Sequence, residues 1–197
     1  MALTRISRAL LLSFFMVLAA CASRPPEISI PVEPGAFYYD ISGNSVQELR
    51  ASLASERSKS VPGGRFDGYT RWRLRWRYRF DQSEEHCSLS EFSTELIVQL
   101  FLPRWSMPLE PDPDLVEKWG QYLIALTGHE GGHVEIAQEA EVAIQSAVWR
   151  TPSARSCSEL REGIEITIRE VIEAYNILSR AYDEASNHGA AQRAQFP

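Results

Sequence analysis

The sequence predicts an α+β fold, in which a small antiparallel β-sheet packs against two long α-helices. Residues 69–80 alternate arginine with apolar side chains, as expected for a strand with one buried face. Residues 89–102 continue this alternation, whereas residues 112–150 and 156–187 space their apolar side chains at helical intervals. We therefore expect one folded domain over residues 36–197, large enough to bury a sizeable core.

Each element has local signals. Residues 37–41 are expected to form a short strand, which is followed by a turn at residues 42–44. Ser45 and Glu48 have the spacing of a capping box, which predicts a helix from there to about Arg57. Asp112 followed by proline is a typical helix start, and a second capping box at residues 156–159 begins the last helix.

The strand at residues 69–80 carries arginines on one face and aromatic or apolar side chains on the other. Such a basic face can bind phosphates, or it can be a solvated sheet face that pairs with acids. Glu91 and Glu95 on the next strand favour the second interpretation. The basic face consists of Arg71, Arg73, Arg75, Arg77 and Arg79.

The segment His129-Glu130-Gly131-Gly132-His133 has the pattern H-E-x-x-H inside a predicted helix. Residues four apart project from the same face of a helix, so both imidazoles can bind one Zn²⁺ ion. Glu130 is then placed to act as general base toward a water at the metal. Two solvated histidines without a metal are the alternative interpretation. The clustered use of two of the chain's four histidines favours the metal site.

The N-terminus resembles an export signal. Residues 1–20 contain two arginines followed by an apolar run, which is too short for a membrane span of ~20 residues and fits a signal peptide. The small residues before Cys21 resemble a bacterial lipobox, which implies lipidation of Cys21 and a membrane anchor. Residues 21–35 are rich in proline and are expected to form a tether. Ala22 resembles the sorting pattern of outer-membrane lipoproteins that face the periplasm, whereas ordinary secretion is the alternative.

Charge and cysteine content restrict the partners further. After removal of residues 1–20, 18 basic residues stand against 26 acidic ones, which does not favour nucleic acid as a partner. Cys87 and Cys157 are then the remaining cysteines, and in an exported protein such a pair predicts one disulfide.

The chain resembles the bacterial exported proteins classed as domain-of-unknown-function family 922, which are grouped with zincin-like peptidases. The resemblance rests on residues 38–43, the Arg/Trp strand at 68–76, the exit at 102–105, the two cysteines, the H-E-x-x-H motif and the closing segment 182–192. It implies a zincin-like active-site helix with His129 and His133 as ligands and Glu130 as general base. Ser186 stands where the family has Thr, and Arg193 stands where it has Gly.

A catalytic zinc needs a third protein ligand. A simple hairpin of the last two helices about residue 153 would bring Glu173 or Glu170 level with the motif, whereas the resemblance implies His188. We prefer His188, with Glu173 as the alternative. Asp183 is a candidate hydrogen-bond acceptor behind a ligand histidine, and Tyr182 a candidate donor to a developing oxyanion.

These observations predict a zinc metallopeptidase of the cell envelope that hydrolyses peptide bonds, with peptide or protein substrates. By analogy with zincins, residues 96–102 are expected to form the sheet edge that binds an extended substrate. A non-catalytic envelope lipoprotein with a structural or degenerate zinc site is the alternative. Hydrolysis of a non-peptide bond is a third possibility.

Overall fold

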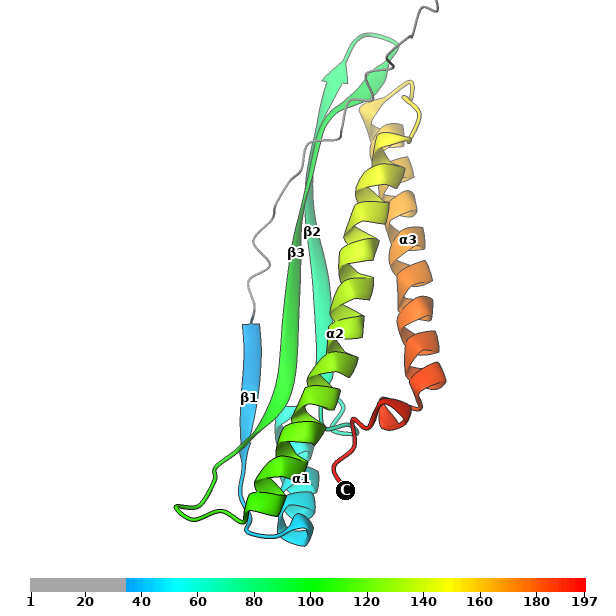
Figure 1. Ribbon diagram of the computed structural model, residues 1–197. Helices are drawn as coiled ribbons and strands as arrows, with labels where there is room; N and C mark the ends of the chain where they lie inside the picture. The colour runs from blue at the N-terminus through cyan, green and yellow to red at the C-terminus, as the bar shows by residue number, and fades with distance from the viewer. Residues whose placement is uncertain (1–34) are drawn as a thin grey trace, which may run out of the picture.

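The computed structural model describes residues 35–197, which form a three-stranded sheet and three α-helices (Figure 1). The predicted signal peptide at 1–20, the lipidation site Cys21 and all but the last residue of the tether at 21–35 lie outside the described residues. None of the described helices is long and apolar enough to span a membrane. The elements in order are β1 (Gly35–Ile41), α1 (Val46–Ser60), β2 (Tyr69–Gln82), β3 (Cys87–Trp105), α2 (Pro113–Trp149), α3 (Cys157–Ser186) and the short 3₁₀ helix η1 (Ala190–Gln192).

The α+β class is confirmed, but the sheet is mixed and its strand order is β1-β3-β2. β2 and β3 form a long antiparallel hairpin, in which Tyr69 pairs with Phe101 and Gln82 with Cys87. β1 runs parallel to β3, with Gly35 opposite Gln99. The prediction of a purely antiparallel sheet is therefore wrong. Its physical reason is that α1 and β2 intervene between β1 and β3 and return the chain to the same end of the sheet.

β3 is the central strand, so the prediction that residues 96–102 form a free edge is also wrong. Within the described residues β2 pairs with one neighbour only, and its other edge is free. The outer face of this hairpin carries the expected ion pairs, with Arg79 2.8 Å from Glu91 and Arg75 3.5 Å from Glu95. These exposed pairs contribute little to stability, about 0–1 kcal/mol each.

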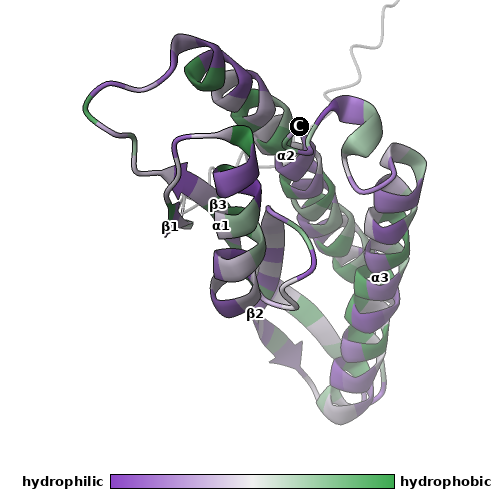
Figure 2. Ribbon diagram, turned by 90° about the horizontal axis from the view of Figure 1, so that it is seen from below, coloured by the Kyte–Doolittle hydropathy of each residue, from purple (hydrophilic) through white to green (hydrophobic). Residues whose placement is uncertain are grey.

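α2 and α3 lie side by side along the sheet, and α1 lies near the end where α2 begins (Figure 1). Viewed from below, hydrophobic and hydrophilic bands alternate along the helices, as expected when one face of each is buried (Figure 2). The core has one cluster at the α1 end, around Leu49, Trp119 and Phe196, and another at the opposite end, around Ile144 and Ile164.

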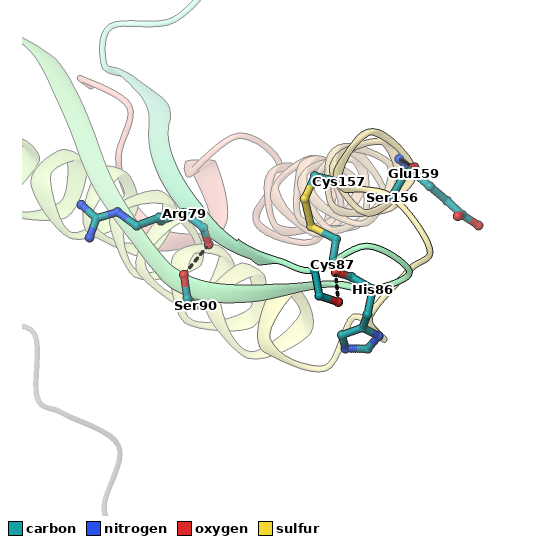
Figure 3. Close-up of a disulfide and its surroundings, with 8 residues drawn as sticks. Arg79, His86, Cys87, Ser90, Ser156, Cys157 and Glu159 are labelled. Carbon is teal, nitrogen blue, oxygen red and sulfur yellow. Dashed lines mark hydrogen bonds between the residues drawn. A yellow bond between two sulfur atoms is a disulfide. The ribbon is translucent and has the colours of Figure 1, made fainter.

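The predicted disulfide between Cys87 and Cys157 is confirmed, and it joins the start of β3 to the start of α3 (Figure 3). Cys87 also exchanges two backbone hydrogen bonds with Ala154 in the loop between α2 and α3. Because the disulfide links residues 70 apart, the chain-entropy argument gives it a stabilisation of about 4 kcal/mol. It fixes the end of the helix pair that is remote from the H-E-x-x-H motif.

Candidate metal centre

The H-E-x-x-H motif lies in the middle of α2, which is an uninterrupted helix from Pro113 to Trp149. His129 and Glu130 are buried, and the centres of the His129 and His133 rings lie 5.1 Å apart. α3 packs against this part of α2 and brings Ser179, Tyr182 and Asp183 to the two histidines. The site is therefore built between two helices and the beginning of β2.

Three side chains converge on one point. Asp183 Oδ1 lies 3.3 Å from His129 Nε2 and 3.1 Å from His133 Nε2. One ligand atom from each of these residues lies within 4.8 Å of the other two. Two imidazole nitrogens and one carboxylate oxygen are a donor set that suits Zn²⁺, so the residues present fit the metal that the motif implies.

The outer nitrogen of each imidazole has its own partner. His129 Nδ1 lies 2.8 Å from Gln192 Oε1, which can only accept, so His129 carries its proton on Nδ1. His133 Nδ1 lies 2.9 Å from the hydroxyl of Ser179. Burial lowers the pKa of His133, which favours the neutral ring. His129 is thus arranged to offer the lone pair of Nε2 to a cation, and His133 can do the same when its Nδ1–H donates to the Ser179 hydroxyl.

Glu130 is 4% exposed and lies against the beginning of β2. The hydroxyl of Thr70 donates a hydrogen bond of 2.7 Å to Glu130 Oε2. Burial raises the pKa of this carboxyl to about 7, against the opposing effect of the Thr70 hydrogen bond. A Cβ atom at Gly68 would lie 2.5 Å from Glu130 Oε1, so only glycine allows this approach. Neither Thr70 nor Gly68 could be identified as part of the site from the sequence, because threonine and glycine are not diagnostic of a metal centre.

The two predicted third ligands occupy different places. Glu173 is exposed and pairs with Arg180 at 3.1 Å, outside the residues that line the site. His188 is near the centre, with its Nδ1 3.8 Å from Asp183 Oδ1 and its ring stacked on Phe66 at 4.4 Å. Asp183, expected only behind a histidine, is the carboxylate that meets both motif histidines. His188 is therefore placed beside the cluster.

α3 is shifted along α2 by more than one helical turn from the position that a simple hairpin predicts. The simple hairpin would put residues 174–176 level with the motif, whereas His133 meets Ser179 and His129 meets Asp183. The loop is not symmetric, because Gly163, well inside α3, faces Thr151 at the end of α2. α3 therefore begins beyond the end of α2, where Cys157 reaches Cys87.

Tyr182 packs against the H-E-x-x-H motif. Its ring stacks on that of His129 at 5.1 Å, and its hydroxyl donates to the His129 carbonyl at 3.2 Å. A Cβ atom at Gly132 would lie 2.5 Å from this hydroxyl, which explains one of the motif's glycines. Tyr182 does not line the cavity beside the cluster, so its position favours a supporting role over the oxyanion contact that we expected.

The C-terminal segment folds back under the site. Asn187, His188 and Gly189 have left-handed backbone conformations, which turn the chain sharply after α3. The hydroxyl of Ser186 accepts a hydrogen bond from the Gly189 amide, a contact that a Thr hydroxyl at this position could also make. Phe196 then packs on Trp119 and Tyr122, and this packing fixes the segment that carries Gln192.

A cavity of about 710 Å³ opens beside the cluster. Its walls come from α1, the loop before β2, the first residues of β2, α3 and the C-terminal segment. His129, Glu130, His133, Asp183 and His188 all line it. The cavity is large enough for several residues of a peptide and gives direct access to the cluster of His129, His133 and Asp183.

A family model described as "Bacterial protein of unknown function (DUF922)" matches residues 37–189. The match spans nearly the whole described chain, from β1 to the turn after α3, and confirms the family resemblance read from the sequence. It ends before Gln192, the partner of His129. No curated protein and no solved structure shows significant similarity to the chain.

Proposed function

We propose that this chain, which belongs to the DUF922 family of bacterial proteins of unknown function, is a zinc-dependent metallopeptidase. The observation that carries the proposal is the convergence of His129, His133 and Asp183 beside a buried Glu130 at an open cavity. When bound, zinc would polarise the scissile carbonyl and lower the pKa of water toward ~7. His129 and His133 would hold it through Nε2, and Asp183 through its carboxylate.

In this proposal Glu130 moves the proton. Its carboxylate takes a proton from the attacking water as the C–O bond forms, and gives it to the leaving nitrogen as the C–N bond breaks. The products are a carboxylic acid and an amine. A base whose pKa is raised by burial is suited to accept and return a proton near neutral pH. Thr70 orients the carboxylate through Oε2.

The free edge of β2 supports a peptide as substrate. Gly68 and residues 69–72 at the start of this edge strand line the cavity together with Glu130 and the motif histidines. An extended peptide can add to such an edge by backbone hydrogen bonds, which would place one of its carbonyl groups over the site. This edge takes the place of the one that we expected at residues 96–102.

The alternative, a non-catalytic lipoprotein with a structural metal, is less well supported by the geometry. A structural zinc site is usually closed by four protein ligands. Here three residues form the cluster and the cavity leaves its remaining side accessible. Hydrolysis of a non-peptide amide would use the same groups, so a panel of substrates must separate it.

The test is the Glu130→Gln variant of the full-length protein. We expect it to bind zinc as the wild type does and to lose peptide hydrolysis by at least about a thousandfold, because the general base is gone. Zinc content and cleavage of fluorogenic peptides are measured on the same samples. Full peptidase activity of Glu130→Gln would refute the mechanism.

The cellular location is a proposal as well. We propose that Cys21 anchors the protein to the cell envelope, with the domain facing the periplasm from the outer membrane. The support is the lipobox-like sequence before Cys21 and the disulfide, which fits an oxidising compartment. Membrane fractionation of the wild type and Cys21→Ala checks it, and retention of the variant in the membrane would contradict lipidation.

A further inference from the structure

We propose that the substrate is an acidic peptide, whose carboxylate side chain binds Arg50 and Arg65 in the wall of the cavity. This inference rests on the proposed function, because it names the substrate class for the same site. The chain has a formal net charge of −6, yet five arginines and only three carboxylates line the cavity. The cavity is therefore positive in a protein that is otherwise acidic, and a divalent cation would increase this difference.

Two of the three carboxylates in the cavity belong to the centre itself. Asp183 meets both motif histidines and Glu130 accepts a hydrogen bond from Thr70, whereas Asp67 pairs with Arg57 at 2.8 Å and accepts a hydrogen bond from Tyr122. Of the remaining arginines, Arg180 pairs with Glu173 and Arg71 bonds the neutral side chain of Gln99. Arg50 and Arg65 thus stay without an acidic partner among residues 35–197.

These two arginines come from consecutive segments of the chain that line the same cavity. Arg50 lies on the face of α1 that turns to the cavity, together with Leu53, Ala54 and Arg57. Arg65 lies in the loop between α1 and β2, next to Phe66, which stacks on His188. Both side chains are exposed, so they can meet a ligand at little desolvation cost.

Arg50 and Arg65 differ from the other arginines without an acidic partner among residues 35–197 in that, with Arg71, they line the cavity. Away from the cavity, Arg75 and Arg79 each pair with a glutamate of β3. Arg73 and Arg77, also on β2, have no acidic partner in the described part of the chain, but they do not line the cavity. Guanidinium groups bind carboxylates through two parallel hydrogen bonds, which makes an aspartate or glutamate side chain the matching ligand.

The elements that form the walls of the cavity determine where the acidic residue of the substrate lies relative to the scissile bond. A peptide along residues 68–72 of β2 would pass Glu130, and its side chains on the α1 side would face Arg50 and Arg65. The acidic residue of the substrate is therefore expected on one side of the cleaved bond only. A peptide with aspartate or glutamate at that position should be cleaved faster than its asparagine or glutamine counterpart, because the amide carries no charge.

The test uses the full-length, zinc-loaded protein and a set of internally quenched peptides of one sequence. Single positions on either side of the central bond carry Glu, Gln or Lys. We expect kcat/KM for the best Glu peptide to exceed that of its Gln counterpart about tenfold, and this ratio to fall with added salt. In the double variant Arg50→Gln/Arg65→Gln the ratio should fall to about one. The matched control is Arg75→Gln, on the outer face of the sheet, which should keep the wild-type ratio.

Binding separates this inference from the proposed function. The zinc-loaded Glu130→Gln variant is titrated with the same peptides, and their affinity is measured by fluorescence anisotropy. Tighter binding of the Glu peptide that depends on Arg50 and Arg65, without cleavage by the wild type, would support the acidic ligand and refute the peptidase. Cleavage by the wild type without preference for Glu would overturn the inference and leave the peptidase standing, whereas binding without preference and without cleavage would overturn both. Neither cleavage nor binding would overturn both.

Discussion

The side chain of Gln192 accepts a hydrogen bond from the imidazole of His129, with 2.8 Å between Oε1 and Nδ1. This contact connects the C-terminal segment to α2 and fixes the tautomer that leaves the lone pair of His129 Nε2 free. The amide nitrogen of Gln192 donates in turn to the hydroxyl of Tyr182, at 3.1 Å. One side chain close to the C-terminus therefore orients two residues of the centre.

Replacement of Gln192 by Leu should weaken zinc binding roughly 10- to 100-fold, since His129 then loses the acceptor that orients its ring. The dissociation constant is measured by competition with a chromophoric chelator. Gln121→Leu is the matched control, because Gln121 is an exposed residue of α2 that bonds only Glu117. Equal affinities of wild type and Gln192→Leu would show that the contact does not orient the ligand.

Arg193 should lower the free energy of unfolding, because its backbone has a conformation that favours glycine. Its φ of 65° lies in the left-handed region, which costs a non-glycine residue roughly 1–2 kcal/mol. We expect Arg193→Gly to raise the free energy of unfolding by about 1 kcal/mol in urea denaturation. Arg150→Gly, at a right-handed helix end, is the control and should bring no gain.

The two central glycines of the motif should respond in opposite ways. A Cβ atom at Gly132 would collide with Tyr182, whereas nothing lies within 4 Å of one at Gly131. Gly131→Ala should stabilise the protein by up to about 1 kcal/mol through its helix propensity, and Gly132→Ala should destabilise it. Thermal unfolding of both metal-free variants checks this, and a stabilising Gly132→Ala would show that Tyr182 is not held against α2.

The contribution of Glu130 to the stability of the metal-free protein should fall between pH 4.5 and 7. Because burial raises the pKa of Glu130 to about 7 from 4.5, the folded state binds this proton more tightly than the unfolded chain does. The contribution is complete below pH 4.5 and lost above pH 7, a change of up to about 3 kcal/mol. Glu130→Gln should remove this dependence in urea denaturation with a chelator. The exposed control Glu173→Gln should keep it, and an unchanged profile in Glu130→Gln would refute the assignment.

Elements with a local signal could be predicted from the sequence. The alternation in β2 requires one buried face, and the capping boxes are present, with Ser45 accepting from the Glu48 amide and Ser156 from that of Glu159. The direction of β1 could not be predicted, because a run of alternating residues is the same for a parallel and an antiparallel partner. It is set by the connection through α1 and β2.

The residues of the candidate metal centre also divide into those that a local sequence pattern predicts and those that only the tertiary fold brings together. The motif fixes His129, Glu130 and His133 by helical periodicity alone. Asp183 depends on how α3 is shifted along α2, and the asymmetric loop before Cys157 sets that shift. Gln192 and Thr70 are common polar residues in unremarkable surroundings, so only the folded chain shows that they meet His129 and Glu130.

Zinc binding by variants of the third ligand tests the central claim most directly. Elemental analysis and calorimetry are carried out on the wild type, Asp183→Ala and Glu173→Ala, with folding checked by circular dichroism. We predict one zinc per chain in the wild type and in Glu173→Ala, and an affinity at least about a hundredfold lower in Asp183→Ala. A folded Asp183→Ala variant that binds zinc as tightly as the wild type would contradict the account.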